Sequence, residues 1–192
     1  MTTIRQPASI LLWAVALLSA MAWSAQDVPK GYAEVPKEQL KGLTFVVPDG
    51  SCSLTAPGPD WKWLVGGDEQ HRNYSCFNTR TGISHTVGIG RVKKEINERV
   101  RNETQASTRK ACEAGGFKVS NEKWEAAAAP VPGKTWRLTY DMTAGGVTMK
   151  VTICLVQTAE HTLVTLQNAA PAGSDSKTFD RFVASLTVTE GK

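Results

Sequence analysis

The sequence predicts an α+β fold: one twisted, mostly antiparallel sheet with one long helix and a C-terminal helix packed on it. Two observations predict it. Segments in which apolar and polar residues alternate, as in half-buried strands, follow one another through short turns. A stretch rich in helix-forming residues, 94–114, separates these segments into two groups. The order strands, long helix, strands, short helix is typical of α+β domains.

The first group of strands precedes the long helix. In 83–92 the apolar residues Ile83, Val87 and Ile89 alternate with small or polar ones, which predicts one buried face. The turn signal Pro48-Asp49-Gly50 separates the first two strands. The expected strands of this group are 43–48, 52–55, 73–78 and 83–92.

The second group follows the helix and contains the clearest alternation. In 147–156 the residues Val151, Ile153 and Leu155 share one face, whereas Cys154 falls on the other. Ala144-Gly145-Gly146 predicts a hairpin turn before this strand. The expected strands are 117–124, 134–142, 147–156 and 161–167.

The two predicted helices differ in their apolar faces. Helix 94–114 has a thin stripe and ends at Gly115-Gly116. Helix 174–186 has a regular one, because its apolar residues recur at i, i+3, i+4 and i+7: Phe179, Phe182, Val183 and Leu186.

The N-terminal 25 residues have the composition of a secretory signal peptide. Arg5 precedes a short apolar run, and Ala20-Met21-Ala22 offers a cleavage site, with Ala25 as a second candidate. The run is shorter than the roughly 20 residues that span a bilayer. We therefore expect a signal peptide at 1–25, an N-terminal arm at 26–42 and a single α+β domain at 43–192, in a periplasmic or secreted protein.

The four cysteines indicate disulfide bonds, because an even number in an exported chain is typical of them. No C-x-x-C pair is present, which argues against zinc and redox sites. Three pairings are possible. Cys52–Cys76 and Cys112–Cys154 are favoured, since a bridge from Cys112 would anchor the thinly apolar long helix.

Several segments resemble the PsbP-like α/β/α domain of exported proteins over about residues 43–188. The pattern Phe-x-Val-Pro-x-Gly, Leu-x-x-Pro and Trp occurs between Phe45 and Trp61, and the closing helix ends Phe-Val-Ala-Ser-Leu-Thr-Val at 182–188. The resemblance implies a binding or accessory role. No functional residue of the family matches a position here, and the four cysteines depart from it.

Catalytic and cofactor motifs are missing. The chain has no G-x-S-x-G, Walker or H-E-x-x-H sequence, so we expect no cofactor and no metal. His85 shares the apolar face of its strand, which favours a core histidine over a base or metal ligand. His71, beside Asp68 and Glu69, is expected in a solvated loop, and His161 in a turn.

Trp61 and Trp63 are the candidate interaction residues. They lie between the prolines at 57 and 59 and the glycines at 66 and 67, so we expect an adaptable loop that presents two indoles to a ligand or partner. The alternative is that both rings anchor the loop in the core.

The expected function is that of an exported, disulfide-stabilised, non-enzymatic binding or accessory protein of the bacterial envelope. Its partner would be another protein or a small ligand. Nucleic acid is not expected, because the net charge of +4 is not clustered. One alternative is an inhibitor or immunity protein that binds a partner enzyme. Another is a hydrolase with a Cys/His site that no motif reveals.

Overall fold

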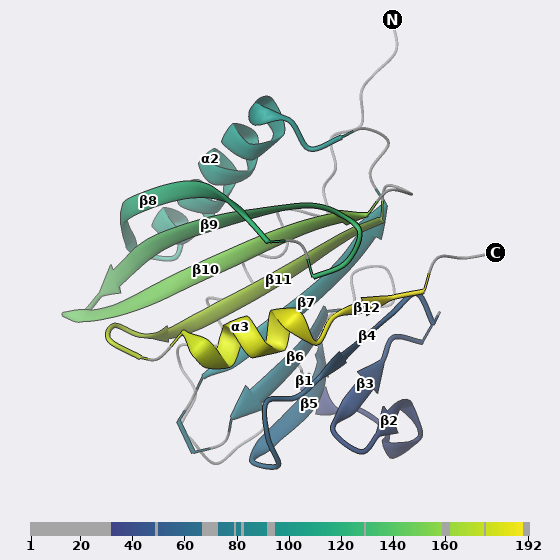
Figure 1. Ribbon diagram of the computed structural model, residues 1–192. Coiled ribbons are helices and arrows are strands. Elements are labelled where there is room, and N and C mark those ends of the chain that lie inside the picture. Colours follow the sequence, from purple (N-terminus) through teal and green to yellow (C-terminus); the bar gives the residue numbers. More distant parts are fainter. Residues whose placement is uncertain are drawn as a thin grey trace, which may run out of the picture.

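The computed structural model of the chain describes residues 32–48, 50–66, 73–78, 80–81, 83–91, 95–128, 130–158, 162–174 and 176–189. The described residues form a large antiparallel sheet, a small sheet and two α-helices (Figure 1). The predicted α+β class is confirmed. The predicted signal peptide lies outside the described residues.

The large sheet has eight strands, in the order β1-β5-β6-β7-β11-β10-β9-β8, and every neighbouring pair is antiparallel. Most predicted strands occur here, several of them longer than expected. The strands are β1 (Tyr32–Glu34), β5 (Trp61–Gly66), β6 (Asn73–Asn78), β7 (Ser84–Arg91), β8 (Lys118–Ala127), β9 (Gly133–Ala144), β10 (Val147–Thr158) and β11 (Thr162–Pro171).

The small sheet has the order β12-β4-β3-β2 and joins the two ends of the described chain. Its strands are β2 (Leu40–Lys41), β3 (Thr44–Val46), β4 (Cys52–Thr55) and β12 (Thr187–Val188), and a 3-10 turn (Lys37–Gln39) precedes them. The segment expected to be an arm therefore contributes β1 to the large sheet and β2 to the small one. Val35 between them is in the core, 5% exposed.

The long helix α2 (Glu98–Ala114) covers one face of β8, β9 and β10, here called the α2 face (Figure 1). It begins later than predicted, because Asn97 caps it: the Val100 N–H donates to Asn97 Oδ1 over 3.1 Å. The side chains buried beneath it include Thr104, Thr108 and Cys112.

The short helix α3 (Lys177–Ala184) and the small sheet cover the opposite face, here called the α3 face (Figure 1). The predicted apolar stripe is confirmed, since Phe179, Phe182, Val183 and Leu186 are all buried.

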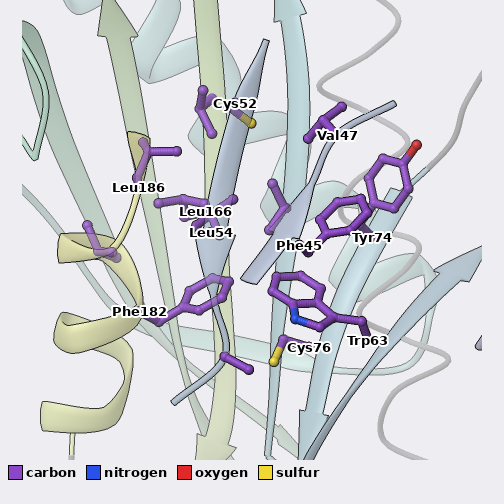
Figure 2. Close-up of a cluster of buried hydrophobic side chains, with 14 of the residues drawn as sticks. Phe45, Val47, Cys52, Leu54, Trp63, Tyr74, Cys76, Leu166, Phe182 and Leu186 are labelled. Atoms are coloured by element: carbon purple, nitrogen blue, oxygen red, sulfur yellow. The ribbon is translucent and has the colours of Figure 1, made fainter. Parts of the chain in front are cut away.

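Aromatic rings fill the core on the α3 face, where side chains from distant parts of the chain meet (Figure 2). The ring of Phe45 in β3 lies 5.0 Å from that of Trp63 in β5 and 4.7 Å from that of Tyr74 in β6. The Trp63 ring is in turn 5.9 Å from that of Phe182 in α3. This cluster joins both sheets and α3, and it includes three of the four cysteines.

The predicted disulfide bonds are not present in the structure: none of the four cysteines is bridged, and all are buried. Cys112 belongs to the core on the α2 face and Cys154 to the core on the α3 face, so the body of the sheet separates them. Cys52 and Cys76 share one core but lie at opposite ends of it (Figure 2).

Replacing Trp63 by alanine should lower the free energy of unfolding by about 3–5 kcal/mol, because the change leaves a cavity between the two sheets. Urea unfolding followed by circular dichroism measures it. Val147→Ala is the control, since Val147 is 62% exposed and its loss should change stability by less than about 0.5 kcal/mol. Equal, small effects of both variants would contradict this packing.

Candidate functional site

The two candidate interaction residues lie in a strand of the large sheet, and the expected loop is absent. Trp63 is 4% exposed, and its indole Nε1 donates to the carbonyl oxygen of Leu43 over 3.2 Å. Trp61 is half-buried. Gly66 pairs with Tyr32 of β1, and a Cβ at Gly66 would come within 2.6 Å of the Tyr32 ring. Glycine at this position thus permits close packing. Trp63 is a core residue, and the prediction of two exposed indoles does not hold for it.

His85 lies beneath Trp61 in a cage of aromatic rings. The imidazole stacks on the Trp61 ring at 4.5 Å between centroids, and the rings of Phe182 and Phe179 in α3 lie 4.9 and 5.3 Å away. His85 is 1% exposed. The expectation of a core histidine on the apolar face of β7 is confirmed.

Burial keeps the His85 imidazole neutral. It lowers the pKa of His85 from its usual 6.5 to about 4, and interactions with the Ser84 backbone and the Asn168 side chain only partly offset this effect. Neither ring nitrogen makes a hydrogen bond of good geometry within the described residues, and Oδ1 of Asn168 is likewise unpaired there. Orphaned buried groups of this kind are costly.

The structure places a thiol next to this histidine, because Cys76 in β6 is the direct cross-strand partner of His85. The pair does not resemble a catalytic dyad. Burial raises the pKa of the Cys76 thiol far above its usual value, and no cation counteracts it. A nucleophilic cysteine needs the reverse, a thiolate stabilised by a charged or hydrogen-bonded base.

A second buried thiol, Cys154, lies beside the guanidinium of Arg137, its cross-strand partner in β9. Burial raises the pKa of Cys154, and Arg137 acts in the opposite direction without reversing the shift. Arg137 also donates through Nη2 to Oδ1 of Asp180 in α3 over 2.8 Å. His85 is on the second strand over from Cys154, roughly 10 Å away by strand spacing, so these two groups do not form a pair.

Beyond α3 the same face of the sheet is open to solvent and polar. The tip of the β9–β10 hairpin extends past the start of α3 (Figure 1), and three cross-strand pairs on this side are partly or fully exposed. Six residues make up this polar patch: Thr139 with Thr152, Asp141 with Lys150, and Thr143 with Thr148.

Within the patch some groups are already paired and others are available. Asn121 donates to Oδ2 of Asp141 over 2.7 Å, and the hydroxyls of Thr143 and Thr148 are 3.0 Å apart. Lys150 is exposed. The sequence held a signal for this patch, because polar residues alternate with Leu138, Tyr140 and Met142 in β9.

No metal site occurs among the described residues, since no group of three or more His, Cys, Asp or Glu side chains gathers there. His71 and His161 lie outside the described residues. In the described part of the chain, no helix has both the length and the apolar character that crossing a membrane requires.

Comparison with known proteins identifies a shared fold. No family model matches the chain, and no curated protein matches its sequence. Protein Mog1 superposes with a TM-score of 0.51 at 12% identity, over 78% of this chain and 96% of that one. A crystal structure from Bacteroides thetaiotaomicron VPI-5482 gives 0.50 at 12% identity, over 79% of this chain and 50% of that one, so this chain spans about half its length.

A third structure, LpqN, involved in cell envelope biogenesis of Mycobacterium tuberculosis, gives a TM-score of 0.45 at 12% identity, over 83% of this chain and 92% of that one. A TM-score below 0.5 is too low to establish a shared fold. The first two structures support a Mog1/PsbP-like fold for the chain, and identities this low indicate the fold alone and no family.

All four thiols should be unreactive in the folded protein. Ellman's reagent at pH 8 should label none of them rapidly, because all four are buried and burial raises the pKa of Cys76, Cys112 and Cys154. In urea without reductant, four thiols should react. A fast-reacting thiol in the native protein would support an enzyme, and fewer than four in urea would show that disulfides form after all.

Proposed function

We propose that the chain is an exported, non-catalytic accessory protein of the bacterial envelope that binds its partner through the polar patch. The observation that carries this proposal is the contrast between the two parts of the α3 face. The thiols of Cys76 and Cys154 and the imidazole of His85 are buried on this face, whereas its exposed part offers hydroxyls and charged side chains for hydrogen bonds and ion pairs.

The buried groups favour binding over catalysis. Cys76 and Cys154 are held as thiols and His85 as neutral imidazole. A general base or nucleophile must reach a substrate within hydrogen-bond distance. His85 is under Trp61, and Cys154 is fully buried.

The patch is suited to recognition by shape and hydrogen bonding. Its side chains stand on two long strands whose twelve paired positions hold them in register. Threonine side chains have few rotatable bonds, so ordering them on binding costs little. The charges Asp141 and Lys150 are opposite and adjacent, which favours a partner surface with a matching pair.

Export follows from the N-terminal sequence. The mature protein should begin near Trp23 or Gln26, because the small residues that signal peptidase requires end there. N-terminal sequencing of the protein from a periplasmic or culture fraction tests this. Recovery of the chain with Met1 attached, in the cytoplasmic fraction only, would contradict it.

Charge reversal at Lys150 should weaken capture of the partner roughly tenfold, because a like-charge contact replaces an attractive one. Mature wild-type protein and Lys150→Glu are immobilised, and proteins bound from the native envelope are quantified by mass spectrometry. Lys110→Glu is the matched control, since it makes the same charge change on the exposed side of α2.

The partner is the protein that wild type and Lys110→Glu capture and Lys150→Glu does not. All three variants should unfold at the same temperature, so that the loss of capture does not reflect a loss of stability. Equal capture by all three variants would exclude the polar patch. Turnover of an envelope substrate by the wild type would exclude the non-catalytic role.

A further inference from the structure

Two of the contacts that attach helix α3 to the large sheet differ in chemistry. One is aromatic: Phe179 and Phe182 pack against the His85 imidazole at 5.3 and 4.9 Å between ring centroids. The other is ionic, between Asp180 and Arg137 at 2.8 Å. Both rest on the α3 face, and neither involves α2 or the core beneath it.

The aromatic contact depends on the protonation state of His85. The imidazole is covered by Trp61 on one side and by the two phenylalanines of α3. A charged imidazolium needs acceptors for two N–H groups, and here both nitrogens lack a well-formed hydrogen bond within the described residues.

The groups around His85 do not outweigh its burial, although the Ser84 backbone and the Asn168 amide favour the protonated form. From β6 the neighbour is Cys76, a protonated thiol, and from β11 it is Asn168, a neutral amide. From α3 the carboxylate of Asp180 is bound to Arg137 of β9. The imidazolium therefore gains a hydrated environment only when α3 moves away.

We propose that α3 is an acid-released latch: protonation of His85 detaches α3 and β12 from the sheet, while α2 and its core stay folded. Local release is favoured by the construction of the C-terminal segment. Helix α3 has eight residues, too few to be stable unpacked. β12 is short: it pairs with β4 at Thr187 and Val188, and the Thr189 N–H donates to the Ser51 carbonyl oxygen.

The direction of the pH effect follows from linkage. Burial lowers the pKa of His85 from 6.5 to about 4 in the closed form. An opened form takes up a proton below about pH 6.5, and the closed form does so only below about pH 4. Opening is therefore favoured progressively between these two values, by up to tenfold per pH unit and roughly 300-fold in all.

The cysteines supply a reporter for this opening. Cys154 lies beside Arg137 on the α3 face, whereas Cys112 lies under α2 on the other face. The folded, mature protein is pulsed with 4,4′-dithiodipyridine, which labels thiols at acidic pH, at several values between pH 7 and pH 4. Mass spectrometry of peptides then gives the labelling rate of each cysteine.

The ratio of the Cys154 rate to the Cys112 rate should rise steeply as the pH falls, towards the roughly 300-fold limit. The ratio cancels the pH dependence of the reagent itself. A constant ratio would overturn the latch. It would mean either that neither thiol becomes labelled or that both labelling rates rise together because the whole protein unfolds.

Two variants separate His85 from Asp180, whose ion pair with Arg137 is the other attachment described above. His85→Phe keeps an aromatic ring in the cage and removes the proton site, so its ratio should stay constant. Asp180→Asn removes the carboxylate and should retain the rise. A rise that persists in His85→Phe, or is lost in Asp180→Asn, would overturn the assignment to His85. If His85→Phe does not fold, Asp180→Asn still tests the proposal, because loss of the rise in that variant would assign the effect to Asp180.

Discussion

Cross-strand register is the constraint on which the α3 side of the molecule depends. One row of aligned residues runs across five strands: Cys76, His85, Asn168, Thr152 and Thr139. Because side chains alternate between the two faces, a slip of one residue would move this whole row to the α2 face. The row also changes character along its length. It begins among aromatic rings beneath the small sheet and ends in partly exposed threonines.

Helix α3 lies where that change occurs, which explains its mixed attachment. Its apolar residues pack on the inner part of the row, and Asp180 reaches Arg137 near the outer part. The paired charges Arg137 and Asp180 are partly exposed, so their net contribution to stability is small. Most of the attachment is therefore apolar and aromatic, and it includes a ring that can acquire a charge.

Local sequence patterns were sufficient to predict the elements with strict periodicity and not those fixed by long-range contacts. The alternation in 147–156 and the stripe of α3 were both found. Trp61–Gly66 was expected as a loop, because prolines and glycines flank it, and its strand character comes from pairing with β1 and β6. The strands β1 and β2 within residues 26–42 likewise depend on their pairing with β5 and β3. Single segments do not show which partner will pair with them.

The expected Cys112–Cys154 bridge shows how a local pattern must be combined with packing. The alternation in β10 had already placed Cys154 opposite Ile153 and Leu155. Since α2 packs on the face that carries Ile153 and Leu155, Cys112 and Cys154 are separated by the sheet itself. Which face of the sheet α2 covers depends on tertiary packing, and the few apolar residues of α2 do not indicate that face. The same face choice leaves the polar side chains of β9 and β10 uncovered, so the placement of α2 positions both the buried thiol and the exposed surface.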